Sequence, residues 1–175
     1  MTDEEARQAR NRQYFLKSLG TGREPVPRQW LSVRADLTRL GFPAHRRPHV
    51  ETGDRMLIYA SGHQRIVAAG EMASAPVFDE SLPEDDERWD ERDAKRWPWR
   101  ATWRPLLAVG DVADGFELAE IGVSTLSVRS QSHVFIDEAQ YRQGVGLLAR
   151  AAASGGEAYV PAYRDSLPRT PGDPR

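Results

Sequence analysis

Arrangements of residues that carry acid–base, nucleophilic or metal chemistry are scarce in this chain of 175 residues. It has no cysteine, which excludes disulfides, cysteine-ligated zinc and thiol catalysis. Two of its four histidines, His45 and His49, are four residues apart, but two arginines and Pro48 stand between them, so a cation would face fixed positive charge. There is no serine–histidine–aspartate order with supporting turns, no phosphate-binding glycine loop and no carboxylate pair at a strand end. We therefore expect no metal, no cofactor and no catalytic residue.

Aromatic residues are more informative, because their faces can stack on a nucleobase. The chain has five tryptophans. In a strand, Trp97, Trp99 and Trp103 would share one face, because side chains repeat every two residues. Three indoles on one face form either a wall of the core or a platform on which bases stack, and the pattern leaves both open. Tyr59, in an apolar run, is open to the same two interpretations.

The elements that would position these residues are mainly short strands. Apolar or alternating runs between glycines and prolines predict strands over 14–17, 55–60, 65–72, 97–109 and 134–136. The second and third of these strands are separated by a turn at 61–63 and so form a hairpin. Asp137 is expected to cap a final helix over 138–153, with Tyr141, Val145 and Leu148 on its apolar face. Elsewhere the pattern predicts a helix over 2–11, a strand leading into a short helix over 30–40, a short helix or turn over 116–121, and loops over 20–27, 41–50 and 79–93.

Short strands with a few helices favour an α+β fold, a small curved mixed sheet or open barrel with flanking helices, over a parallel sheet. We expect an N-terminal helical extension over 1–12, one domain over 13–153 and a disordered tail over 154–175. The tail has four prolines, three glycines and no period.

Charge is unevenly distributed along the chain. The net charge is -2, yet the segment 79–93 alone has nine acidic residues and two arginines. The rest of the chain is therefore mildly basic, most clearly over 23–49, and a nucleic-acid partner is compatible with it. No apolar run is long enough for a membrane span, and no secretory signal is visible, so we expect a cytoplasmic protein without a membrane partner.

Four short segments, in order, resemble the motifs of EVE domains. Trp30-Leu-Ser-Val-Arg34 is similar to the family's W-x-G-V-R element, with Ser32 in place of glycine. Gly53-Asp54 followed by Leu57-Ile-Tyr-Ala-Ser61 is similar to its G-D-x-x-x-F-Y-x-S strand. The following strand and the approach to the last helix are matched by Ala68–Met72 and by Arg129-Ser-Gln-Ser132 running into 136–141.

The first strand of the family corresponds to Tyr14-Phe-Leu-Lys-Ser18. Two positions depart from the family's pattern. Leu19-Gly20 replaces a Glu-Pro pair, and Ala35 replaces a common asparagine. Both positions line the pocket in family members, so the departures bear on which ligand is bound.

The resemblance, over roughly residues 13–152, implies the PUA-like fold, which EVE domains share with YTH and ASCH domains. It also implies a non-enzymatic module that binds one flipped, modified nucleobase, such as a modified cytosine, in DNA or RNA. The base-binding residues implied are Lys17, Ser18, Trp30, Ser32, Val33, Arg34, Tyr59, Ser61, Trp97 and Trp99. Contacts to the nucleic-acid backbone are assigned to Arg28, Arg46, Arg47, Arg129 and Ser132.

Three alternatives stay open. The first is a general RNA-binding PUA-like domain without preference for a modified base. The second is a protein-interaction module that uses the tryptophan cluster. The third is an amidohydrolase like some ASCH relatives, which need a lysine and an acid close together; Lys17 is its candidate, because it ends the first predicted strand.

Overall fold

The computed structural model describes residues 12–30, 39–84, 89–129, 131–155 and 158–159. Strands dominate this part of the chain: β1 (Tyr14–Leu19), β2 (Arg39–Phe42), β3 (Arg55–Ala60), β4 (Arg65–Met72), β5 (Val77–Phe78), β6 (Trp99–Val109), β7 (His133–Ile136) and β8 (Ala158–Tyr159). They form one sheet in the order β2-β6-β4-β3-β1-β7, with β5 and β8 also paired to β6. The helical elements are α2 (Glu91–Arg96), η3 (Val112–Asp114), η4 (Leu118–Ile121), α3 (Thr125–Arg129) and α4 (Glu138–Gly155).

The sheet is mixed, because β1 runs parallel to β3 while the other pairs are antiparallel. The hairpin predicted from sequence is β3–β4, with a register shift between Ile58 and Tyr59. Its turn needs left-handed backbone, which Gly62 adopts with a φ of 87° and Gln64 with a φ of 58°. The predicted α+β class with a curved mixed sheet and flanking helices is thereby confirmed.

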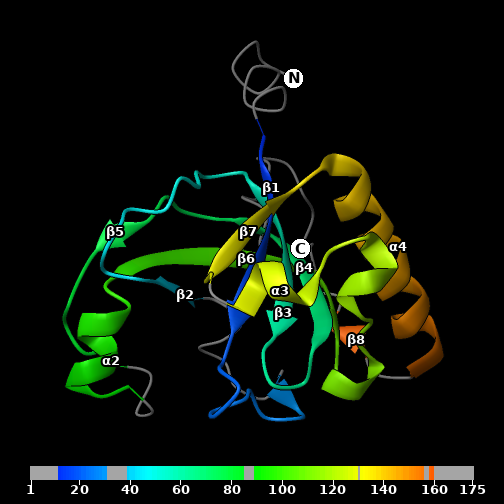
Figure 1. Cartoon of the computed structure of the whole chain (residues 1–175), viewed down its shortest axis with the longest axis horizontal. Coiled ribbons are helices and arrows are strands. Elements are labelled where there is room, and N and C mark those ends of the chain that lie inside the picture. The colour runs from blue at the N-terminus through cyan, green and yellow to red at the C-terminus, as the bar shows by residue number, and fades with distance from the viewer. Residues whose placement is uncertain (1–11, 31–38, 85–88, 130, 156–157, 160–175) are drawn as a thin grey trace, which may run out of the picture.

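Strand β6 is the long strand shared by two parts of this curved sheet (Figure 1). Its first half pairs with β2 on one side and β5 on the other, and its second half pairs with β4 and β8. A second register shift lies between Ala69 and Gly70 of β4, where it pairs with β6. Such irregularities increase the local bend and twist of a sheet. The result is a sheet that carries α2 at one end and α4 on the face of the other.

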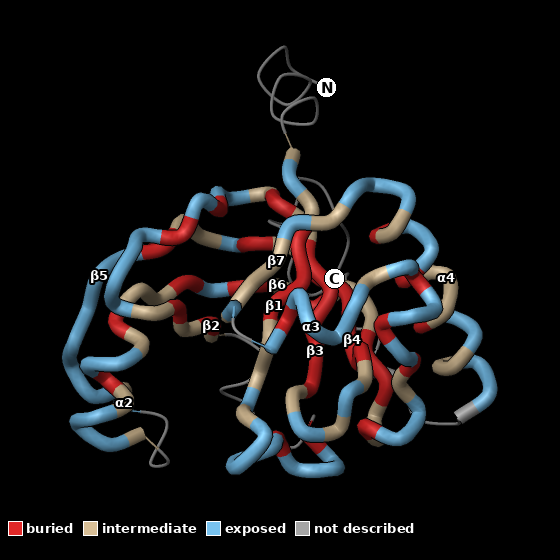
Figure 2. The backbone as a smooth tube through the Cα atoms, viewed as in Figure 1, coloured by how far each residue is buried: buried red, intermediate tan, exposed pale blue. Residues whose placement is uncertain are grey.

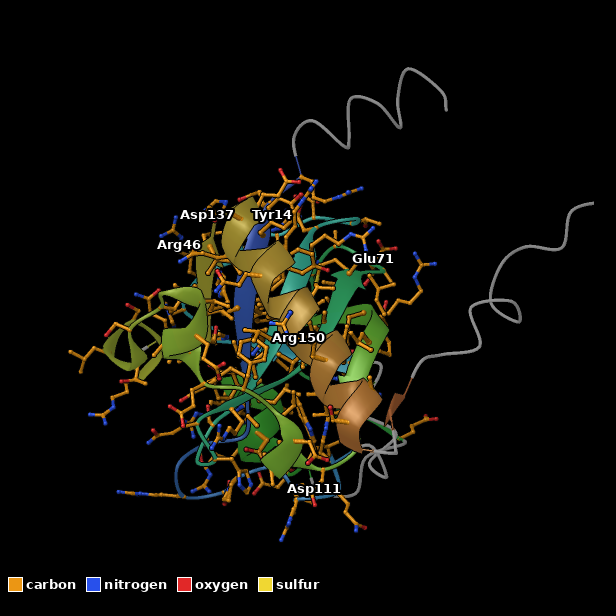
Figure 3. All side chains as sticks on the ribbon, turned by 90° about the vertical axis from the view of Figure 1, so that its right-hand side faces the viewer. Tyr14, Arg46, Glu71, Asp111, Asp137 and Arg150 are labelled. Atoms are coloured by element: carbon orange, nitrogen blue, oxygen red, sulfur yellow. The ribbon has the colours of Figure 1, made fainter. Side chains whose placement is uncertain are left out.

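Helix α4 packs on the sheet as its sequence pattern predicts (Figure 3). It begins with a reciprocal cap, in which the Gln140 N–H donates to Asp137 Oδ1 at 2.7 Å and the Asp137 N–H donates to Gln140 Oε1 at 3.0 Å. Tyr141 and Leu148 are buried. The ring of Tyr141 lies 5.1 Å from that of Tyr14 on β1, which fixes the start of the helix against the sheet.

The core lies in the centre of the sheet, where β1, β3 and β4 are largely buried (Figure 2). Trp103 belongs to it, with 3% of its surface exposed, so the core interpretation of this tryptophan is correct. Trp30 is also fully buried, and its indole N–H donates to the Val109 carbonyl at 3.1 Å. The prediction that Trp30 lies at a pocket rim is therefore wrong, because its ring and its one polar atom are both used inside the protein.

Three local predictions need correction. Part of the acidic segment is not a loop but α2, because the Asp90 side chain accepts from the N–H groups of Arg92 and Asp93 and so caps a helix. Trp97 ends that helix instead of starting β6, so Trp97 and Trp99 do not follow strand periodicity together. The loop predicted over 41–50 starts two residues too early, because β2 continues to Phe42.

Several predicted segments fall outside the described residues: the helix over 2–11, most of the strand and helix over 30–40, and residues 160–175 of the predicted tail. Within that tail range α4 continues to Gly155, and β8 pairs with β6.

Candidate functional site

A cavity of about 1090 Å³ lies among the described residues at the open end of the curved sheet. One wall is formed by the ends of β1 and β3 and the loops that follow them, together with α3 and residues 131–132. The opposite wall is formed by β2 and α2. The two walls come from different parts of the sheet. Strand β2 pairs with the first half of β6 and so lies away from β1 and β3, on the other side of the cavity (Figure 1).

The cavity collects about half of the site residues predicted from sequence. Its lining includes Lys17, Ser18, Tyr59, Ser61, Trp97, Arg129 and Ser132. Ser18 and Tyr59 are paired residues of the parallel strands β1 and β3, so their proximity follows from the sheet register. The main-chain N–H of Ser18 also donates to the Ser132 carbonyl at 3.0 Å, and this bond holds the residue before β7 against the same wall.

Lys17 is the chemically most unusual residue of the cavity. Only 3% of its surface is exposed, and its Nζ donates to the Ser18 carbonyl at 2.8 Å. The ammonium also lies 5.1 Å from the ring centroid of Phe42. Burial lowers the pKa of Lys17 from 10.5 to about 7. No ion pair joins Lys17 to any carboxylate of the described residues, so the protein compensates its charge only weakly.

His133 lies opposite Lys17 in the β1–β7 ladder. Its Nδ1 is 3.2 Å from Ser132 Oγ, and its ring makes edge contacts with Phe42 at 5.4 Å and Phe135 at 5.8 Å. The pKa of His133 is lowered to about 4, mainly by burial and next by the positive charge of Lys17. Its imidazole is therefore neutral at pH 7, in line with a structural histidine.

Two indoles line the α2 wall, and sequence reasoning found one of them. Trp97 was predicted; Trp89 was not, because it lies inside the acidic segment read as a solvated loop. A Cβ added at Gly41 would lie 3.0 Å from Trp97 Cβ and 3.3 Å from Trp89 Cη2, so both residues pack on β2 where a glycine leaves room. The guanidinium carbon of Arg96 lies 5.0 Å from the Trp97 ring, and that of Arg100 lies 5.0 Å from the Trp89 ring.

The cavity is polar, with more basic than acidic side chains. Its acidic lining residues are Glu24, Asp90 and Asp93, and its basic ones are Lys17, Arg39, Arg92, Arg96 and Arg129. An excess of positive charge over aromatic walls suits a ligand that combines a flat ring with an acceptor or anionic group.

The remaining predicted residues lie elsewhere or outside the described part. Trp99 does not line the cavity but contacts the Phe78 ring at 5.2 Å, with the Arg47 guanidinium carbon 6.0 Å from its ring. Arg46 is exposed and its Nη2 lies 2.9 Å from His49 Nε2. Arg28 forms an ion pair of 2.7 Å with Asp111, away from the cavity. Ser32, Val33 and Arg34 fall outside the described residues.

The part of the chain that the structure describes contains no group of three or more histidine, aspartate or glutamate side chains placed to hold a metal ion. None of its helices has the length and apolar character needed to cross a membrane.

Fold and cavity together define an α+β protein with a curved mixed sheet and an aromatic, basic cavity at its open end. No protein-family model and no curated protein matches the sequence. Among solved structures, the chain is similar to a hypothetical protein from Leishmania major, with 14% identity, 81% of this chain and 98% of that chain covered, and a TM-score of 0.49.

An ASCH protein from Zymomonas mobilis is similar with 18% identity, coverage of 78% and 96%, and a TM-score of 0.47. A protein from Pseudomonas putida is similar with 18% identity, coverage of 77% and 98%, and a TM-score of 0.46. All three TM-scores are below 0.5.

Proposed function

We propose that this chain is a non-enzymatic nucleic-acid-binding module that holds one flipped, modified nucleobase of DNA or RNA in the cavity at the open end of the sheet. A modified cytosine is the example we favour. The observation that carries the proposal is the convergence of seven sequence-predicted site residues, from β1, β3, α2, α3 and their loops, on one cavity. The motif resemblance to EVE domains, which assigned these residues to one site, supports the same function.

The chemistry of the lining residues suits a base taken out of a strand. A flipped base loses its stacking partners, and an aromatic side chain can replace one of them for about 1–3 kcal/mol per base. Trp97 and Trp89 can offer such faces, whereas Tyr59 lines the cavity with only 6% of its surface exposed and belongs to the core. Serine hydroxyls at Ser18 and Ser61 can bond a base edge, and Arg129 can bond a phosphate or carbonyl oxygen.

The cavity is large enough for a nucleotide. Small-molecule sites enclose about 300–1000 Å³, and this cavity, at about 1090 Å³, slightly exceeds that range. A base modification such as a methyl group adds only about 1 kcal/mol per buried carbon. We therefore expect aromatic stacking to dominate affinity and cavity shape to select the modification.

We propose binding without catalysis because the cavity lacks a paired acid for its one lysine. A lysine with a lowered pKa can act as a base or nucleophile, and that property keeps the amidohydrolase alternative testable. Such an enzyme needs an acid beside the lysine, and no carboxylate of the described residues forms an ion pair with Lys17. A reaction would show as turnover of the bound nucleoside, which chromatography detects.

Tryptophan fluorescence tests the proposal directly. The intact chain is titrated with short single strands and nucleosides that contain cytosine, 5-methylcytosine, 5-hydroxymethylcytosine or methylated adenine. We expect saturable quenching by a modified base, unchanged nucleoside after incubation, and a loss of roughly 5–150-fold in affinity in Trp97→Ala. Trp99→Phe is the matched control, because Trp99 lies outside the cavity. Absence of quenching by every ligand would overturn the proposal.

A further inference from the structure

The ammonium of Lys17 has more hydrogen-bond donors than the described protein satisfies. An ammonium offers three donors and no acceptor. One of them is used, in the bond of 2.8 Å to the Ser18 carbonyl, and the face of Phe42 receives the charge at 5.1 Å. With 3% of its surface exposed, the side chain has little access to bulk water, yet it lines the cavity. A buried, cavity-lining donor of this kind points to an acceptor on the ligand.

We propose that Lys17 reads a carbonyl oxygen of the bound base, and that the base binds together with one proton taken up by Lys17. This inference rests on the proposed function and adds the identity of the base edge. It selects derivatives of cytosine, uracil, thymine and guanine, each of which has an exocyclic carbonyl oxygen. Adenine derivatives lack one.

The exclusion of adenine follows from the chemistry of the donor. Lysine binds guanine through O6 and N7, whereas adenine is read by side chains that both donate and accept. An ammonium placed against the exocyclic amino group of adenine would oppose donor to donor, and the only acceptors that adenine offers are ring nitrogens. With an exocyclic oxygen turned towards Lys17, a base that has a carbonyl group is therefore preferred over adenine before the modification itself is read.

Proton uptake follows from the burial of Lys17. In the free protein burial lowers the pKa of Lys17 to about 7, so at pH 8 most molecules carry a neutral amine. A hydrogen bond from the ammonium to a carbonyl favours the charged form and raises the pKa in the complex. Binding then requires protonation, and affinity falls as the pH rises above about 7, by up to tenfold per pH unit until the pKa of the complex is reached.

His133, the partner of Lys17 on β7, does not produce this dependence, because its pKa of about 4 keeps the imidazole neutral throughout the range above pH 7. The groups that face the same region are His49 and Arg46 of the 43–50 segment, Glu24 of the 20–27 loop, Arg39 of β2, Arg92, Arg96, Asp90 and Asp93 at α2, and Arg129 of α3.

The test is a binding titration of the intact chain with a cytosine-containing strand at pH 7 and pH 8.5, because cytosine does not titrate in this range. We expect roughly a tenfold weaker affinity at the higher pH for the wild type. Lys17→Met should bind weakly with no pH dependence. Lys95→Met is the matched control, since Lys95 is the second of only two lysines and is exposed; it should behave as the wild type.

Calorimetry at pH 8 in two buffers of different ionisation enthalpy should give an uptake approaching one proton for the wild type and none for Lys17→Met.

The outcomes separate this inference from the proposed function. Tight binding that is independent of pH and unchanged in Lys17→Met overturns the inference alone. Equal or tighter binding of methylated adenine than of cytosine derivatives also overturns it. Failure of every base to bind at both pH values overturns the proposed function and the inference with it.

Discussion

Lys17 on β1 and His133 on β7 are paired residues of one antiparallel ladder, and the charge of the lysine is one cause of the low pKa of the histidine. Burial is the larger cause, and together they bring the pKa of His133 to about 4. Phe42 lies against both side chains, 5.1 Å from the ammonium and with its ring centroid 5.4 Å from that of the imidazole. Two basic groups are thus held in a poorly solvated part of the protein, and each should leave a signature in the pH dependence of stability.

For His133 the signature is acid instability. The unfolded state binds a proton near pH 6.5 and the folded state only near pH 4, so stability is lost as the pH falls through this window. We expect His133→Asn to lose less stability than the wild type between pH 7 and about pH 4.5, by roughly 1 kcal/mol, because the imidazole is partly exposed and solvent screens part of the effect. Urea denaturation at the two pH values measures it. The raised pKa of Asp54 acts in the opposite direction but is common to both proteins, so it cancels in the comparison. Equal losses in the two proteins would contradict the prediction.

For Lys17 the signature appears at alkaline pH. Its folded pKa of about 7 lies below the unfolded value of 10.5, so the unfolded state binds more protons between these values and stability rises with pH. Replacement by methionine removes this cost, and we expect Lys17→Met to be more stable at pH 7 by a few kcal/mol. The gain should shrink by pH 9.5. Guanidinium denaturation checks it, and Lys95→Met, at an exposed position of α2, should show no gain at either pH. A Lys17→Met protein less stable than the wild type at pH 7 would sink the assignment of a strained, buried ammonium.

How far the sequence predicts this structure depends on the range of the interactions involved. Strands β3 and β4 were predicted within their observed bounds because their apolar runs and the turn between them are local signals. The cap of α4 by Asp137 is local as well. The parallel pairing of β1 with β3 is not, since it joins residues about forty positions apart and depends on the curvature of the whole sheet.

The same distinction applies to the cavity. Motif resemblance placed Lys17, Tyr59 and Arg129 in one site, and the fold brings them to one cavity. Periodicity failed for Trp97, because the acidic cap at Asp90 starts a helix inside a run of charges that reads as solvated loop. The burial of Trp30 could not be read from its motif, since its partner, the Val109 carbonyl, lies on a distant strand.

Two glycines of α4 give a matched test of helix packing. A Cβ added at Gly144 would lie 2.6 Å from Leu57 Cδ1 and 3.2 Å from Phe116 Cζ, whereas one at Gly146 would meet only the end of Arg150, at 3.9 Å. Leu57 is fully buried and has little room to yield. We expect Gly144→Ala to destabilise the protein by about 1–3 kcal/mol. Gly146→Ala should stabilise it by about 0.5–1 kcal/mol, because alanine is the better helix former. Thermal unfolding of the two variants decides the matter, and stabilisation by both would show that α4 does not pack closely on β3.

Arg46 and Arg47 test the contacts to the nucleic-acid backbone. Both are exposed, and neither forms an ion pair with a carboxylate in the part of the chain that the structure describes, so both can bind phosphates without breaking a bond to an acid. Each phosphate contact that is lost should reduce the slope of log K against log salt by about 0.7–0.9. For the double variant Arg46→Gln/Arg47→Gln we expect a slope whose magnitude is lower by roughly 1.5. All strands should bind more weakly alike, with the preference for a modified base retained, because backbone contacts position a strand without specifying its sequence.

Arg142→Gln is the control: Arg142 is paired with Glu138 at 2.6 Å on α4, away from the cavity, and its loss should leave the slope unchanged. An unchanged slope in the double variant would remove Arg46 and Arg47 from the interface and leave Arg129, on the cavity wall, as the phosphate contact to test next.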